Sequence, residues 1–251
     1  MARLFVLGVF LVLFAGFSAR ADGAVVIAVT NGGDAIVEGT EIAADETFSV
    51  PEGAVVTLIR EDGQIVQIQG PFSGVVESGD KGTDEDTDWN ALTIFLTGPR
   101  DSVPALGAAR VADKWSDLPD QPDVWQVSID SSGPRCVRPG PVELWRRDAE
   151  RDARVSIRTE AGRLGDLSWP QAEHGLKLPA DFSVVDGRMA VSLDDTVRTL
   201  TVAVLPDDLV GAPTGRVLTW LIDQQCSRQA RTLIDALHSG QYDAAEGGIS
   251  K

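Results

Sequence analysis

The sequence predicts a mainly β protein made of two β-rich lobes, sandwich- or barrel-like, that closes with an amphipathic C-terminal α-helix. Short apolar stretches of period two recur between Gly- and Pro-containing turns, and only the last part of the chain changes to helical spacing. A stretch rich in proline, glycine and charge divides the strands into two groups. The expected segments are a signal peptide (1–21), a first lobe ending in a short helix (22–99), a linker (100–122), a second lobe with the helix (123–240) and a flexible tail (241–251).

The composition is that of a globular chain with an acidic surface. Hydrophobic residues make up 43% and charged residues 24% of the 251 residues, and the formal net charge is −16. A nucleic-acid binder needs a basic face for the phosphates, so we expect no nucleic-acid partner.

The N-terminus has the features of a secretory signal peptide. Arg3 precedes the apolar run Leu4–Phe17, and Ala19-Arg20-Ala21 supplies small residues for a cleavage site. The alternative is a transmembrane anchor, but a spanning helix needs roughly 20 apolar residues. We therefore expect an exported chain, periplasmic in a Gram-negative source, with no stable membrane span after cleavage.

Two cysteines in an exported protein favour a disulfide. Cys136 and Cys226 are the only pair available, and an even count in an oxidising compartment is typical of a bridge. Two buried free thiols are the alternative. A bridge would attach the terminal helix to the second lobe.

The first lobe contains the clearest local signal, a β-hairpin over Val55–Ile68. Its centre, Asp62-Gly63, suits a two-residue type I′ loop. That loop would place Ile59 opposite Val66 and Thr57 opposite Ile68. A short helix is expected next, from Thr87 or Asp88 to Leu96, and Gly98-Pro99 would end it.

The second lobe is predicted from further alternating segments and a final helical stripe. The expected strands contain Trp125–Ile129, Val142–Leu144, Val155–Ile157, Met189–Leu193 and Leu200–Val204, with turns at Ser131–Pro134 and Asp186-Gly187. From Thr214 the apolar residues recur every three or four positions, which predicts one helix with the stripe Leu218, Ile222, Cys226, Ala230, Leu233 and Leu237.

Catalytic and metal signatures are scarce. His174 and His238 are the only histidines, and no zinc motif, Gly-x-Ser-x-Gly elbow or phosphate-binding Gly-rich loop is present in the sequence. The spacing Asp84-x-Asp86-x-Asp88 leaves a calcium-binding loop open, although the rest of an EF-hand is missing. We predict no cofactor and no enzymatic activity.

The tryptophans offer one candidate binding surface. Trp115, Trp145 and Trp169 could stack sugars if they are exposed, and Trp169 next to Pro170 is the best candidate for exposure. The alternative is that these side chains fill the core and the space between the lobes.

Three segments of the first lobe, Gly39–Ile42, Phe48–Leu58 and Asp62–Val66, form a Gly-led step followed by strands and an Asp-Gly hairpin. On these segments the first lobe resembles the periplasmic domain of FecR-type proteins. This resemblance implies a small β-domain in envelope signalling, with strand edges that pair with a partner chain. We find neither an anti-sigma segment nor a spanning helix in the sequence, so we do not expect direct control of a sigma factor.

The second lobe resembles only uncharacterised exported bacterial proteins, on Leu144–Arg146, Trp169-Pro170 and the segment Cys226–Ala230. The sequence therefore favours an exported, non-catalytic binding or scaffold protein with an envelope or periplasmic protein partner. Two alternatives stay open. One is an envelope glycan hydrolase that uses carboxylates such as Asp194-Asp195 and Asp207-Asp208, and the other is a carbohydrate-binding module that uses the tryptophans.

Overall fold

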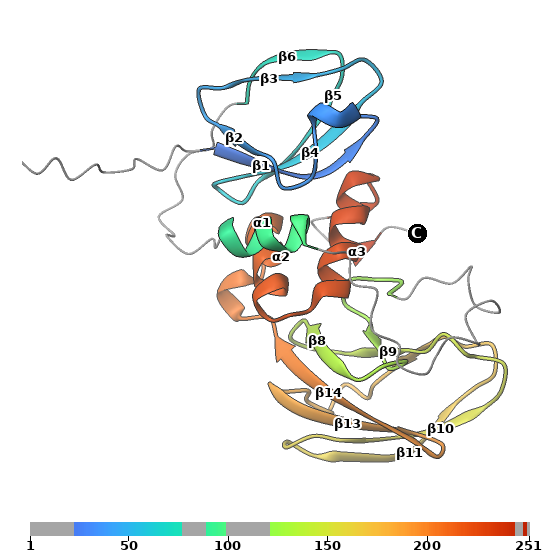
Figure 1. Cartoon of the computed structure of the whole chain (residues 1–251). Helices are drawn as coiled ribbons and strands as arrows, with labels where there is room; N and C mark the ends of the chain where they lie inside the picture. Colours follow the sequence, from blue (N-terminus) through green and yellow to red (C-terminus); the bar gives the residue numbers. More distant parts are fainter. Residues whose placement is uncertain (1–22, 77–88, 99–120, 244–247, 250–251) are drawn as a thin grey trace, which may run out of the picture.

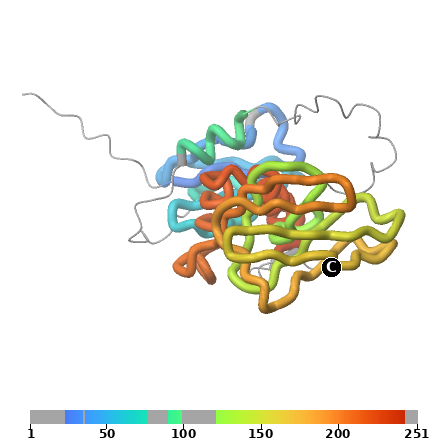
Figure 2. The backbone as a smooth tube through the Cα atoms, turned by 90° about the horizontal axis from the view of Figure 1, so that it is seen from below, coloured from blue at the N-terminus to red at the C-terminus, as the bar shows by residue number. Residues whose placement is uncertain are grey.

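The computed structural model describes residues 23–76, 89–98, 121–243 and 248–249. Over this part the chain is mainly β, as the sequence predicts. Figure 1 shows two β-rich lobes with a layer of helices between them. The view from below has the second lobe in front of the helices, so the three parts are stacked (Figure 2).

The first lobe is a four-stranded sheet covered on one face by a two-stranded ribbon. The antiparallel sheet has the order β2-β1-β4-β5, and β3 pairs with β6. The strands are β1 (Gly23–Thr30), β2 (Glu41–Ala43), β3 (Thr47–Val50), β4 (Val55–Arg60), β5 (Ile65–Gln69) and β6 (Phe72–Val75), with a short 3-10 helix at Gly33–Ala35.

Strand β4 is buried on both faces, because its sheet lies between the β3–β6 ribbon and the helices (Figure 1). Val56 and Leu58 belong to the core between the sheet and the ribbon. Ile59, on the opposite face, belongs to a second core that includes the helices. The sheet therefore has one core on each side, and the helices reach the first lobe directly.

The predicted hairpin is present, but its predicted register is wrong. Ile59 lies opposite Ile65 and Thr57 opposite Gln67, a shift of one residue. The loop has three residues because a type I′ turn needs a positive φ at both central residues, and only Gly63, not Asp62, has one, with φ of +76°. The Gly63 N–H donates to Arg60 O. A three-residue loop of this kind adds a bulge next to the turn, which changes every opposed pair.

The helical layer holds three helices: α1 (Trp89–Thr97), α2 (Thr214–Asp223) and α3 (Ser227–His238). The short helix α1 agrees with the sequence prediction. Its capping residues lie outside the described part of the chain. The prediction of a single terminal helix is wrong, because the helix is interrupted at Gln225, whose φ is +59°.

The helical layer joins both lobes through one shared core. Its members come from β1 and β4, from all three helices and from the start of the second lobe: Val25, Ile27, Ala28, Ile59, Leu92, Leu96, Val124, Cys136, Leu218, Leu221, Cys226, Ala230, Leu233 and Ile234. The predicted stripe is partly confirmed, since Leu218, Ala230 and Leu233 are fully buried. The terminal helices therefore pack on the first lobe as well as the second.

The second lobe is a sandwich of two sheets around its own core. The larger sheet has the order β11-β10-β13-β14-β8, with β8 parallel to β14, and the smaller one has the order β12-β9-β7. The strands are β7 (Val127–Ser128), β8 (Gly133–Val137), β9 (Glu143–Trp145), β10 (Ala153–Arg158), β11 (Arg163–Trp169), β12 (Gly175–Lys177), β13 (Gly187–Leu193) and β14 (Thr196–Val204), and a 3-10 helix spans Asp207–Leu209.

In this lobe one local prediction is wrong and one strand was not predicted. Gly133 and Pro134, expected in a turn, already belong to β8. Strand β11 was not predicted, because it lies at the edge of its sheet and carries too few apolar residues for a clear alternation.

The remaining predicted segments are only partly described. The signal peptide (1–21) and residues 100–120 of the linker lie outside the described residues. In the predicted flexible tail, β15 (Tyr242–Asp243) pairs with β16 (Gly248–Ile249), and Tyr242 packs against the shared core. None of the helices in the described part of the chain has the length and apolar character needed to cross a membrane.

Candidate functional site

The tryptophans do not form the exposed platform that the sequence suggested. Trp169 is completely buried and Trp145 is 4% exposed, while Trp115 lies outside the described residues. Trp169 is the last residue of β11, and its side chain joins the core of the second lobe. The expectation of an exposed Trp169 is therefore wrong. Its large apolar area is used for packing instead.

Arg146 explains why a tryptophan beside charged loops is buried. Its guanidinium carbon lies 4.8 Å from the centre of the Trp169 ring, a distance suited to a cation–π contact. The same guanidinium donates to the carbonyl oxygens of Trp169, Pro170, Arg151 and Glu173. Burial lowers the pKa of Arg146 from its ordinary value. The cluster organises loops and presents no open binding face.

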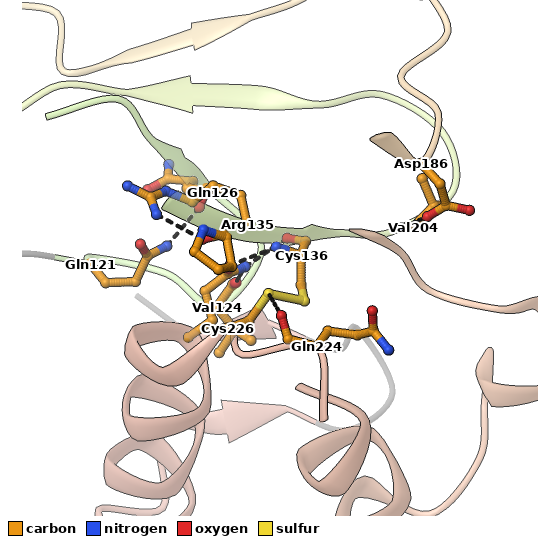
Figure 3. Close-up of a disulfide and its surroundings, with 11 residues drawn as sticks. Gln121, Val124, Gln126, Arg135, Cys136, Asp186, Val204, Gln224 and Cys226 are labelled. Carbon is orange, nitrogen blue, oxygen red and sulfur yellow. Dashed lines mark hydrogen bonds between the residues drawn. A yellow bond between two sulfur atoms is a disulfide. The ribbon is translucent and has the colours of Figure 1, made fainter. Parts of the chain in front are cut away.

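The predicted disulfide is present and lies where the helices meet the second lobe (Figure 3). Cys136 is in β8, and Cys226 is in the short connection between α2 and α3. Both residues are almost completely buried. The bridge attaches the bend of the helix pair to the edge strand of the large sheet, which confirms the predicted attachment in a two-helix form.

Gln229 reinforces this junction, a role that was not predicted from the sequence. Its Oε1 accepts from the Cys136 N–H at 2.8 Å, and its Nε2 donates to Cys136 O at 2.6 Å and to Val124 O at 2.5 Å. The side-chain amide thus pairs with the open edge of β8 as a neighbouring strand would. The sequence feature that could have predicted this role is a glutamine at a position that the helical spacing places on the buried face.

Both histidines make contacts that connect elements of the fold. His238, in the last turn of α3, has Thr30 Oγ1 at 2.7 Å from Nε2 and Thr57 Oγ1 at 2.8 Å from Nδ1. Its carbonyl oxygen accepts from Gln67 Nε2. These contacts connect α3 with β1, β4 and β5. His174 stacks on Trp145, and its Nδ1 lies 2.9 Å from Arg146 O.

The structure brings no metal ligands together in the part that it describes. No group of three or more His, Cys, Asp or Glu side chains there could hold a metal ion. The acidic loop Asp84–Asp88, considered for calcium, lies outside the described residues. The paired acids at 194–195 and 207–208 are exposed. Asp194 accepts a bond from the Arg154 N–H, which connects the turn between β13 and β14 with β10.

The free edge of β5 is the best candidate for an interaction site. β5 ends its sheet, and β4 covers only one of its sides. Arg60 N–H donates to Gln64 O and Gly70 N–H donates to Ala54 O, so the even-numbered residues of β5 bond to β4. The backbone groups of Ile65, Gln67 and Gln69 therefore point away from the sheet.

This edge lacks the features that usually prevent strand pairing. Residues 63–76 contain no charged side chain, and beyond the bulge next to the turn the pairing of Ile65–Gln69 with β4 is regular. Natural edges are commonly protected by charges, bulges, short strands or a covering segment. β5 has five residues in a regular strand, and Gln67 and Gln69 are exposed.

Four other edge strands in the described part of the chain carry such protection. β2 and β12 have three residues each and include Glu41 and Lys177. β11 has a register irregularity opposite β10, and Asp166 there has a φ of +58°. β8 is covered by Gln229. Among the edge strands of the four-stranded and five-stranded sheets, β5 is therefore the one without such protection.

Comparisons with known proteins add no relative. No family model matches the chain, and neither a curated protein nor a solved structure shows a significant match. The function proposed below therefore depends on the geometry of the chain itself.

Proposed function

We propose that the chain is an exported, non-catalytic binding or scaffold protein that takes up an extended segment of a partner protein at the free edge of β5. The observation that carries this proposal is the uncharged, regular and unprotected β5 edge in a chain of net charge −16. Outward N–H and C=O groups on such an edge supply main-chain bonds to an added strand.

The compartment is part of the proposal. The Cys136–Cys226 bridge supports an oxidising environment such as the periplasm. The FecR-like segments of the first lobe, which include the hairpin of β4 and β5, are in line with a role in envelope signalling. The buried Trp145 and Trp169 give no support to carbohydrate binding, and the exposed acid pairs give none to glycan hydrolysis.

The proposal can be tested with two variants of one residue. The tagged mature chain is crosslinked in its native envelope, and captured proteins are identified by mass spectrometry. Gln67→Pro removes one outward N–H without touching the bonds to β4. Gln67→Ala keeps that N–H and also loses the side-chain bond to His238 O, so it is the matched control.

We expect one dominant protein partner for the wild-type chain and for Gln67→Ala, and loss of that partner for Gln67→Pro. With the purified partner, the amide hydrogens of Ile65 and Gln69 should exchange more slowly. Equal capture by Gln67→Pro would show that the β5 edge is not the binding site. Absence of any protein partner would contradict the proposed function itself.

A further inference from the structure

Two arginine side chains converge on a single hydroxyl group next to the start of α3. Arg135 Nη2 lies 3.1 Å from Ser131 Oγ, and Arg228 Nη1 lies 3.2 Å from the same oxygen. Arg135 comes from β8, Arg228 from the first turn of α3, and Ser131 from the loop before β8. A neutral hydroxyl cannot offset two positive charges.

The surroundings of the two guanidinium groups are short of negative charge. Arg135 is 5% exposed and donates to the carbonyl oxygens of Ser128, Ser131 and Pro134, none of which is ionised. Within the described part of the chain, neither guanidinium has a carboxylate oxygen within 4 Å. Burial, and then the charge of Arg228, lower the pKa of Arg135 to about 10.

Asp130 is the acidic group that interacts with both arginines, but it offsets only a small part of their positive charge. Its carboxylate oxygens accept from the backbone N–H of Arg147, each at 3.2 Å. Asp130 is exposed as a residue, yet neighbouring groups crowd its carboxylate, and this desolvation raises its pKa. Two like charges thus lie close together in a chain whose overall charge is strongly negative.

The N-terminus of α3 adds to the positive charge around the two arginines. No side chain caps the helix at Cys226, and no acidic residue lies in its first turn. A helix N-terminus carries a partial positive charge and free N–H groups, which favour anions.

We propose that Arg228 and Ser131, with Arg135 behind them, bind a small oxyanion of the phosphate or sulfate type. Arg228 is partly exposed and can present its fork of donors to such an anion. Arg135 contributes charge and holds the Ser131 loop. The ligand is small because the net charge of −16 repels polyanions and anionic lipid surfaces. This inference does not depend on the proposed function of the β5 edge.

The test compares phosphate and sulfate with chloride at equal ionic strength. Thermal unfolding and calorimetric titration are measured for the wild-type chain, Arg228→Gln and Arg188→Gln. Arg188 is exposed on β13, so its substitution changes the net charge equally without touching the site. Loss of one charge-assisted hydrogen-bonding group should weaken binding about tenfold or more.

We expect phosphate to raise the melting temperature of the wild-type chain and of Arg188→Gln, but not of Arg228→Gln. In chloride alone, Arg228→Gln should melt no lower than the wild-type chain, because it removes repulsion toward Arg135. That result separates lost binding from lost folding.

Three outcomes would overturn the inference. One is no response of the wild-type chain to millimolar phosphate or sulfate. Another is an equal response of all three proteins, which would show a general salt effect. The third is flotation with phosphatidic acid vesicles without any response to inorganic phosphate, which would assign the charge cluster to a lipid headgroup.

Discussion

Gln229, at the junction of the helices and the second lobe, satisfies three buried backbone groups with one side chain. The residue is 1% exposed and bonds Cys136 N, Cys136 O and Val124 O. Each buried polar group left without a partner costs about 1–3 kcal/mol. The amide therefore contributes more than an ordinary hydrogen bond.

Gln229→Ala should lower the free energy of unfolding by on the order of 3 kcal/mol or more, because it leaves the edge backbone groups of β8 without a hydrogen-bond partner and opens a cavity. The measurement is urea unfolding followed by circular dichroism. Gln171→Ala, an exposed control, should stay within about 0.5 kcal/mol of the wild-type chain. Equal, small losses for both variants would show that the β8 edge is satisfied in another way.

At the scale of elements, the apolar spacing could predict helical structure after Thr214 but not the break within it. Leu218, Ile222, Cys226 and Ala230 continue the spacing across the break, so periodicity alone gives one helix. The break is set by the bend at Gln225 and by the disulfide at Cys226. The prediction of the hairpin register failed for a related reason, since the backbone conformation of one residue, Asp62, decided the length of the loop.

Gln225→Gly should stabilise the protein by about 1 kcal/mol, because glycine adopts the left-handed conformation without the steric cost that a side chain carries there. Gln224→Gly is the matched control. Its φ is −78°, so glycine there brings only added freedom in the unfolded chain and should be neutral or destabilising. The midpoints of thermal and urea unfolding check both. A loss of stability in Gln225→Gly would argue against the observed bend.

At the scale of the whole molecule, the sequence predicted the two lobes and the disulfide pairing because both follow from local pattern and from cysteine count. It did not predict that α1, α2 and α3 form a layer that both lobes share. That arrangement depends on contacts between distant segments, such as His238 with Thr30 and Thr57. Nor did it single out β5, since the edge position of a strand follows from topology. The uncharged stretch 63–76 was the only trace of it in the sequence.

The shared core makes the disulfide a constraint on both lobes, which a Cys136→Ser/Cys226→Ser variant would test. The bridge closes a span of 90 residues, for which chain entropy gives about 4–5 kcal/mol of stabilisation. The double variant should lose stability of that order in urea unfolding. Amide exchange should rise in α3, and also in β1 and β4, which pack on it. It should rise less in β10 and β13, whose contacts lie within the second sandwich.

Reduction of the wild-type chain should reproduce the loss of stability, whereas the same reductant should leave the double variant unchanged. Two titratable thiols in the oxidised wild-type chain would refute the bridge, and equal exchange in β1 and β13 would refute the coupling of the lobes through the helices.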